Sequence, residues 1–343
     1  MRKSISILLS LFSISLTQAA SRDAEPILVP RAQKPKIIGL MQVRNEAPII
    51  EQALRGLAVY TDEIIVLDDA SDDDTPAIVQ TLAKELHITE IIQETLSGWT
   101  HRTEIENRQK LLDTGRAHGG THFIELDADE IFTALCAKDN WLRKQILALE
   151  KGQILHLPII NLWKSFDFYR SRIGEFPDIV DCSAIFCDDG ISTLADNKRV
   201  SHSGFIHFGR FPVNRVKQKP DVYSKNLNYS ILHLPFVNWD NTFVKRGWIM
   251  CLEVIRLKEG LSVKFPGRTV RDINDFYKTF HNYSEEGIEL KPTPPEWLDY
   301  SFFDKACYTT RLVTWRKQQV LNWFKHYGRD YFKDLDIWHI NWE

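Results

Sequence analysis

The sequence is poor in cysteine, and beyond its N-terminus it has no long hydrophobic run. Its 343 residues include five cysteines, too few and too scattered for a disulfide-based scaffold. The spacing of Cys182 and Cys187 does not make a convincing half of a zinc site, so we expect most of the cysteines to be small buried side chains. Internal repeats and low-complexity tracts are also missing.

A strong excess of one charge is missing as well. The formal net charge is −3 and the isoelectric point is near 6.4. Proteins that bind the phosphate backbone usually carry a basic excess, so nucleic acid is not an expected partner. With 43% hydrophobic residues, the chain can build one large α/β domain with an appendage.

The N-terminal segment has the pattern of a secretory signal. Two basic residues precede the apolar run Ile5–Leu16, and small residues follow up to Ala19 and Ala20. The run is too short to cross a bilayer comfortably. The pattern predicts export with a cleaved signal at residues 1–20; the alternative is an uncleaved anchor, which would limit membrane contact to this segment.

From Lys36 onward, short apolar runs alternate with helical patterns. This order predicts a mainly parallel sheet with helices on both faces, and such sheets bind ligands beyond the carboxyl ends of their strands. We predict a linker at residues 21–35, an α/β domain at 36–240 and a mainly helical extension at 241–343. The predicted strands cover residues 37–41, 63–67, 89–93, 123–126 and 153–158, and the predicted helices cover about 47–54, 75–86, 103–115, 242–258 and 308–324.

Polar residues follow three of the predicted strands, at 44–46, 68–74 and 127–130. Because the carboxyl ends of parallel strands meet at one edge of a sheet, we expect these segments to converge. Asp127 and Asp129 are close enough to repel each other unless a cation lies between them, and paired carboxylates suit Mg²⁺ or Mn²⁺. The simpler interpretation is that these aspartates only end a strand at the surface.

The segments Ile38–Glu46, Ile65–Thr75, Asn107–Arg108 and Ile124–Glu130 together resemble a family 2 glycosyltransferase of the GT-A fold. The resemblance covers roughly residues 36 to 135. It implies a nucleotide-diphosphate sugar donor such as a UDP- or GDP-sugar, a divalent cation (Mn²⁺ or Mg²⁺), and inversion at the anomeric carbon. The acceptor, whether glycan, lipid or protein, stays open.

The resemblance also assigns roles to individual residues. Asp129 would ligate the metal, while Asp127 would contact the ribose or reach the metal through water. Asp68 would accept hydrogen bonds from the base or ribose. Arg108 lies at the margin of a buried helical stripe, where it either reaches the same crevice or is an ordinary surface arginine. The implied donor-binding residues are Arg44, Glu46, Asp68, Asp69, Arg108 and Asp127.

The general base that inverting transfer requires has no clear match. Members of the family often carry a Glu-Asp pair after the paired aspartates, and this sequence has none there. Asp178 and Asp181 are the candidate bases, with Asp188 and Asp189 behind them, and each can equally be a surface carboxylate.

Two later residues complete the predicted site. His233 can be a core histidine or, as in related enzymes, a further metal ligand, with His207 as the second choice. Lys245 lies on the helix predicted after this strand, where it can approach the diphosphate or simply face solvent.

The missing base motif supports an alternative function, a degenerate protein of the same fold that binds nucleotide or glycan without turnover. A phosphohydrolase that uses Asp127 and Asp129 as nucleophile and acid is disfavoured. That class has the pattern Asp-x-Asp-x-Thr or Asp-x-Asp-x-Val, and Glu130 does not fit it. Nucleotidyl transfer is weaker still, because the glycine-rich entry loop is missing.

Overall fold

The computed structural model describes residues 34–95, 104–194, 210–212, 214–217, 219–259, 269–281, 285–310 and 314–342. The predicted signal at residues 1–20 lies outside these ranges, so export stays a prediction. From Pro35 onward the chain forms one compact unit. Within the described ranges, no helix is both long enough and apolar enough to cross a membrane.

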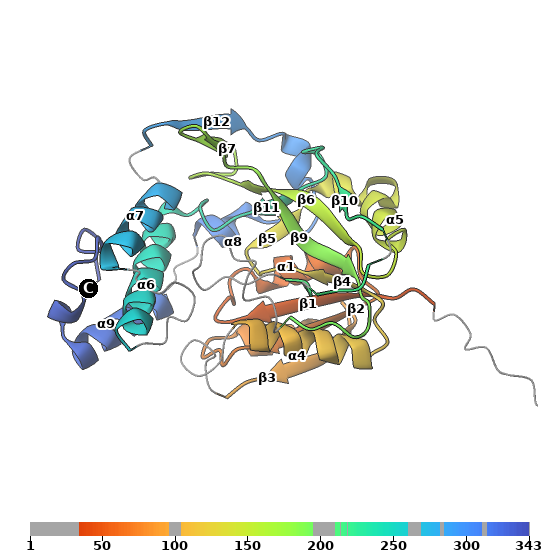
Figure 1. The fold of residues 1–343 in the computed structure, drawn as a ribbon, viewed down its shortest axis with the longest axis horizontal. Helices are drawn as coiled ribbons and strands as arrows, with labels where there is room; N and C mark the ends of the chain where they lie inside the picture. The colour runs from red at the N-terminus through yellow and green to blue at the C-terminus, as the bar shows by residue number, and fades with distance from the viewer. Residues whose placement is uncertain are drawn as a thin grey trace, which may run out of the picture. The chain divides into compact units, whose positions relative to one another are not determined.

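A mainly parallel sheet forms the centre of this unit (Figure 1). In the described part of the chain its strands run in the order β3-β2-β1-β4-β9-β6-β11-β5, and β10 pairs with β6 beside this path. Strand β1 pairs in parallel with β2 and β4, while β9 is antiparallel to its neighbours β4 and β6. The strands are β1 (Ile37–Val43), β2 (Glu63–Asp68), β3 (Ile88–Gln93), β4 (His122–Glu125), β5 (Glu130–Phe132), β6 (Ile154–Asn161), β9 (Val180–Cys187), β10 (Val222–Tyr223) and β11 (Ile231–His233). The predicted α/β class is confirmed.

Strand β1 is apolar on both faces because helices cover both faces of the sheet. Ile37 and Met41 belong to the core on the side of α1 (Ile50–Ala58) and α2 (Thr75–Leu82). Ile38 and Leu40 point the other way, into the core under α4 (Glu104–Ala117). Alternate side chains of a strand face opposite sides, so a continuous apolar run is the expected pattern of a central parallel strand.

Smaller elements extend the sheet on the side of β6. A second, three-stranded sheet has the order β12-β7-β8, with β12 antiparallel to β7. Its strands and the nearby helices are β7 (Phe168–Ile173), β8 (Phe176–Pro177), β12 (Ile288–Pro292), α5 (Trp141–Leu147) and the short 3₁₀ helices η1 (Ala134–Asn140) and η3 (Pro295–Leu298).

The C-terminal part is mainly helical and has its own apolar core. This core is built by α6 (Trp239–Lys258), α7 (Val270–His281), α9 (Thr314–Tyr327) and the 3₁₀ helix η4 (Arg329–Phe332). In place of the single helix predicted for about 308–324, the structure has α8 (Lys305–Thr309) and α9. Tyr308 of α8 packs on the core of the sheet.

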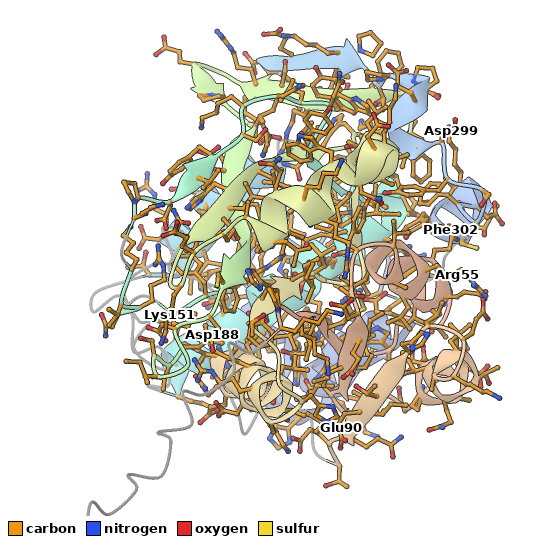
Figure 2. The ribbon with its side chains drawn as sticks, turned by 90° about the vertical axis from the view of Figure 1, so that its right-hand side faces the viewer. Arg55, Glu90, Lys151, Asp188, Asp299 and Phe302 are labelled. Carbon is orange, nitrogen blue, oxygen red and sulfur yellow. The ribbon has the colours of Figure 1, made fainter. Side chains whose placement is uncertain are left out.

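Part of the C-terminal segment returns to the sheet. The Gln52 side chain on α1 donates to the Asp304 carbonyl at 3.0 Å and accepts from the Asp304 amide at 2.7 Å. Figure 2 shows Phe302 beside α1, close to the labelled Arg55. The second core lies entirely beyond residue 240, but Trp297, Leu298 and Tyr308, which also lie beyond it, belong to the core of the sheet. The domain boundary predicted at residue 240 stays a prediction.

Candidate functional site

The turn after β1 is tied to the loop after β2. Asn45 has a left-handed backbone, with φ of 53°, a conformation that asparagine tolerates better than most residues. Its side chain donates to Asp72 Oδ1 at 2.6 Å and accepts from the Asp72 amide at 2.8 Å. The Thr75 hydroxyl accepts from the Glu46 amide at 2.8 Å. These bonds hold the two neighbouring residues of Asn45, Arg44 and Glu46, at the carboxyl edge of the sheet.

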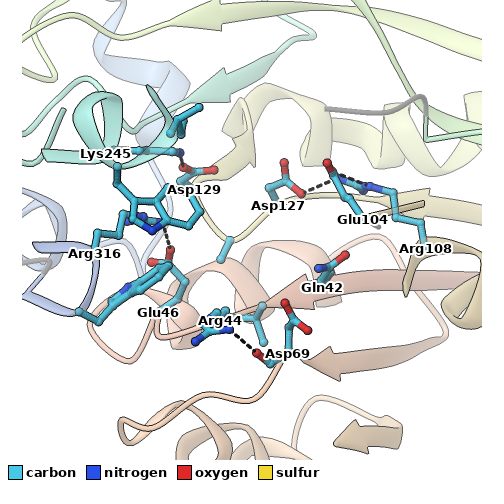
Figure 3. Close-up of a pocket in the computed structure, with 15 residues that line it drawn as sticks. Gln42, Arg44, Glu46, Asp69, Glu104, Arg108, Asp127, Asp129, Lys245 and Arg316 are labelled. Carbon is cyan, nitrogen blue, oxygen red and sulfur yellow. Dashed lines mark hydrogen bonds and ion pairs between the residues drawn. The ribbon is translucent and has the colours of Figure 1, made fainter. Parts of the chain in front are cut away.

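A cavity lies at this edge, between the sheet and the C-terminal helices (Figure 3). It encloses about 760 Å³ of space, counting the part open to solvent. Carboxylates and cations line it side by side, together with two tryptophans. The polar and aromatic lining residues are Gln42, Arg44, Glu46, Asp69, Glu104, Arg108, Asp127, Asp129, Lys245, Trp248, Trp315 and Arg316.

One end of the cavity is a buried ion-pair network around Arg108. This arginine has a side chain only 3% exposed, and it contacts Glu104 at 2.5 Å, Glu125 at 2.5 Å and Asp127 at 3.1 Å. Burial alone would lower the pKa of Arg108, but these carboxylates outweigh it and raise the pKa above its ordinary value. Arg108 is therefore a permanently charged anchor of this wall.

Arg210 was not predicted, yet it holds the other side of Asp127. Its guanidinium contacts Asp127 Oδ2 at 2.7 Å and Glu130 Oε2 at 2.5 Å. Both oxygens of Asp127 are thus bound by arginines. In sequence Arg210 has no helical or strand pattern around it, so no local signal identifies it.

The opposite end of the cavity centres on Asp129. Lys245 Nζ on α6 donates to Asp129 Oδ2 at 2.8 Å. Burial would raise the pKa of Asp129, but Lys245 and the nearby His233 outweigh it and lower the pKa. Figure 3 shows this pair at one end of the cavity and the group of Glu104, Arg108 and Asp127 at the other.

Arg316 on α9 also reaches this end, and sequence reasoning missed it. It is 8% exposed, its Nη2 lies 3.4 Å from Glu46 Oε1, and its Nε has no hydrogen-bond partner among the described residues. Its guanidinium stacks 4.6 Å from the centre of the Trp315 ring. Burial lowers the pKa of Arg316 to about 10. Arg316 therefore adds a buried positive charge to the end of the cavity that contains Asp129.

A signal for Arg316 did exist in the sequence. The buried stripe of α9 consists of Arg316, Val320 and Phe324. An arginine in register with the apolar face of a helix is unusual. The tryptophans of the same helix, Trp315 and Trp323, are only half-buried.

The predicted donor-binding residues come together at the cavity, with one exception. Arg44, Glu46, Asp69, Arg108, Asp127 and Lys245 all line it. Asp68 lies next to the lining, 4% exposed, and its Oδ2 accepts from the Ser71 amide at 3.3 Å. Burial raises the pKa of Asp68. The roles of these residues stay predictions.

The candidate bases lie in ion pairs outside the cavity lining. Arg170 binds both oxygens of Asp178 at 2.9 Å, and Asn161 donates to Asp178 at 2.8 Å. Asp181 pairs with the exposed Lys225 at 2.6 Å. The second-choice bases also have partners. Asp188 forms an ion pair with Arg116, and Asp189 accepts hydrogen bonds from three backbone amides.

His233 lies close to Asp129 because β11 and β5 pair. The amide of Leu234 donates to the Asp129 carbonyl at 2.8 Å, and His233 Nδ1 is 2.7 Å from Asn161 Oδ1. Burial lowers the pKa of His233 to about 4, so its imidazole is neutral at physiological pH. The second-choice ligand, His207, lies outside the described residues.

The three predicted metal ligands do not form a ready site in this arrangement. Among the described residues, no group of three or more histidine, cysteine, aspartate or glutamate side chains is placed to hold an ion. Asp127 is held by Arg108 and Arg210, and Asp129 by Lys245. Lys245 contacts only the Oδ2 of Asp129, so a divalent ion at this carboxylate would share it with the ammonium group.

Residues 40–155 match the family model for Glycosyl transferase family 2. Among solved structures, S. aureus TarS is 14% identical with a TM-score of 0.36, and the match covers 73% of this chain and 44% of TarS. A mannosyltransferase from Pyrobaculum calidifontis, PcManGT, solved in complex with GDP-Man and Mn²⁺, is 13% identical with a TM-score of 0.32, covering 73% of this chain and 70% of that one. This chain thus spans less than half of the TarS chain. No curated protein matches. The structural likenesses are weak, whereas the family match confirms the resemblance seen in the sequence.

Proposed function

We propose that the chain is a family 2 glycosyltransferase of the GT-A fold and that it transfers a sugar from a nucleotide-diphosphate donor held in the cavity at the sheet edge, since residues 40–155 match the model of that family. The observation that carries the proposal is the convergence of the β1, β2 and β4 ends on one cavity that also contains Lys245 and Arg316. Carboxylates there suit ribose hydroxyls, and the cations suit phosphates.

In this proposal the nucleotide lies toward Asp69 and Arg108, and the diphosphate lies toward Lys245 and Arg316. The acceptor hydroxyl oxygen bonds to the anomeric carbon as the bond from that carbon to the diphosphate oxygen breaks, with inversion. The nucleoside diphosphate leaves with the bonding electrons, and the hydroxyl proton passes to a base, for which Asp178 and Asp181 stay the predicted candidates. Lys245 and Arg316 offset the charge that develops on the leaving group.

Dependence of the transfer on Mn²⁺ or Mg²⁺ stays a prediction, and the predicted ligands are Asp127, Asp129 and His233. An ion bound there would stabilise charge on the diphosphate. Lys245 already pairs with Asp129, so it supplies positive charge at the same carboxylate in the absence of an ion.

The direct test is consumption of sugar nucleotides by the full chain. We expect one donor from a panel of UDP-glucose, UDP-N-acetylglucosamine, UDP-galactose and GDP-mannose to release its nucleoside diphosphate, assayed with and without Mn²⁺. Asp129→Ala should stop this release, since it removes the carboxylate that orients Lys245. The matched control is Asp113→Ala, whose carboxylate is exposed on α4. Equal release by both variants would contradict the proposed site.

A second candidate function is nucleotide binding without transfer. It is favoured by the ion pairs of both predicted bases, Asp178 with Arg170 and Asp181 with Lys225. This function predicts that a nucleotide binds while no donor is consumed with any acceptor.

A further inference from the structure

A row of polar side chains crosses three neighbouring strands of the sheet. His233 on β11 lies opposite Glu130 of β5 on one side and opposite Asn161 of β6 on the other. Residues that lie opposite each other on paired strands carry their side chains on the same face, so these three side chains stand in one row. Glu130 also binds Arg210, the arginine that holds Asp127. The row therefore connects β6 with the carboxylates of the proposed donor site.

A buried ion pair lies at the Asn161 end of the row. Arg170 is fully buried, and its guanidinium stacks 4.0 Å from the centre of the Trp163 ring. It donates to both oxygens of Asp178 at 2.9 Å, and Asn161 Nδ2 donates to Asp178 Oδ2 at 2.8 Å. A carboxylate that is paired with an arginine can only accept hydrogen bonds. The nitrogen of the Asn161 amide, and not its oxygen, therefore has to face Asp178.

The orientation of this amide decides which nitrogen of His233 carries a hydrogen. With Nδ2 directed at Asp178, Asn161 presents its Oδ1 to His233, whose Nδ1 lies 2.7 Å from that oxygen. An amide oxygen only accepts hydrogen bonds, so Nδ1 has to be the donor. The imidazole of His233 is neutral and has one N–H hydrogen. Its other nitrogen, Nε2, therefore has a lone pair that can bind a ligand.

The Nε2 of His233 is open to a ligand beside Asp129. The bond to Asn161 is the one hydrogen bond that this side chain makes to a described residue, and Nε2 is not among the fully enclosed polar atoms. The next residue, Leu234, donates through its amide to the Asp129 carbonyl at 2.8 Å, and Lys245 binds only Oδ2 of the Asp129 carboxylate. A neutral imidazole and a carboxylate suit Mn²⁺, and two protein ligands are enough where phosphate oxygens supply others.

We propose that Arg170, Asp178 and Asn161 are positioning residues that hold His233 in the tautomer with its hydrogen on Nδ1, so that Nε2 ligates a divalent cation beside Asp129. Asp178 then acts through Asn161, a task different from that of the proton acceptor predicted from the sequence. The task of the ion rests on the proposed glycosyltransferase function, whereas the tautomer and the binding of the ion can be measured without it.

The first test reads the tautomer directly in the unchanged protein. The full chain is labelled with ¹⁵N at its histidines, and a long-range ¹H–¹⁵N NMR spectrum recorded without metal distinguishes the protonated from the unprotonated nitrogen of each imidazole. The signals of His233 are assigned by their loss in His233→Gln. We expect Nδ1 to be protonated and Nε2 to be unprotonated. A hydrogen on Nε2, or an even mixture of the two tautomers, would overturn the inference.

The second test breaks the network at two places and measures the Kd for Mn²⁺ alone by electron paramagnetic resonance of the unbound ion. Asn161→Leu removes the amide and keeps a side chain of similar size. Asp178→Asn puts an amide opposite Asn161, so that Asn161 is no longer forced to turn its oxygen toward His233. Both variants should populate the tautomer with the hydrogen on Nε2. Both should also raise the Kd roughly tenfold to hundredfold, as is typical when a partner of a metal-bound histidine is lost.

Asn274→Leu is the matched control. Asn274 on α7 also uses both ends of its amide, since it donates to the Asp334 carbonyl at 2.7 Å and accepts from the Asp336 amide at 2.9 Å, in the helical C-terminal part. Its loss should lower the thermal midpoint, as the loss of Asn161 should. It should leave the tautomer of His233 and the Kd for Mn²⁺ unchanged.

Other results would also overturn the inference. A folded Asn161→Leu variant with an unchanged Kd for Mn²⁺ would show that the network only supports the fold. No binding of Mn²⁺ by the unchanged protein would exclude the cation as the ligand of Nε2. An Asp178→Asn variant that loses sugar transfer while its Kd for Mn²⁺ and its His233 tautomer stay unchanged would make Asp178 the general base. By contrast, the expected tautomer and Mn²⁺ binding without consumption of any sugar nucleotide would refute the proposed transfer and support this inference.

Discussion

Replacing Arg108 with methionine is expected to lower the free energy of unfolding by about 3–5 kcal/mol. The change removes the partner of Glu125 Oε1, while Glu125 is fully buried and its Oε2 already has no hydrogen-bond partner among the described residues. A buried carboxylate without its cation is among the most destabilising defects. Urea unfolding followed by circular dichroism measures the effect.

A double variant separates this cause from a simple loss of packing. Arg108→Met combined with Glu125→Met replaces the buried pair by apolar side chains of similar size, which is often neutral or even stabilising. We expect the double variant to regain most of the lost stability. If Arg108→Met unfolds at the same urea concentration as the unchanged protein, the network does not hold this wall of the cavity.

The second large effect is expected for Lys245→Met. The lysine is the cation next to the predicted diphosphate position, and its Nζ is already held at the cavity by Asp129 at 2.8 Å. Losing a preorganised group that stabilises developing charge costs on the order of 10²–10³ in rate. We expect a fall of this size in kcat/KM for the sugar nucleotide.

Lys110→Met is the matched control for this variant. Lys110 has a side chain that is 52% exposed and pairs with Glu94 at 2.7 Å, away from the cavity lining. It should keep the kcat/KM of the unchanged protein. A Lys245→Met variant that stays folded and loses less than about threefold in kcat/KM would show that Lys245 only neutralises Asp129.

Much of the sheet and one side of the site follow from local sequence. The apolar runs of β1, β2 and β4 are continuous because these strands are covered on both faces, and the polar residues after them mark the carboxyl edge. Since the strands are parallel, Arg44, Asp69 and Asp127 had to meet there, and they line one cavity. Topology alone was enough for that prediction.

The other side of the site could not be derived in this way. Arg316 reaches the cavity because α9 packs on α6 through the second apolar core, and the docking of two cores is not encoded in any short pattern. The same limit applies to charge pairing. From the sequence, Asp178 was a candidate general base. In the structure the chain turns between β7 and β9, and Arg170 donates hydrogen bonds to both carboxylate oxygens of Asp178.

The measurement that tests the central claim most directly is calorimetric titration of the folded full chain with UDP and with GDP, each with and without Mn²⁺. The account predicts that one nucleotide binds in the cavity and that Arg44→Ala weakens this binding roughly tenfold or more, as expected for a lost charged hydrogen bond. Arg55→Ala, on the outer surface of α1 beside Glu51 and Glu85, should bind like the unchanged protein. Absence of binding by both nucleotides, or equal binding by the two variants, would contradict a donor site at this edge of the sheet.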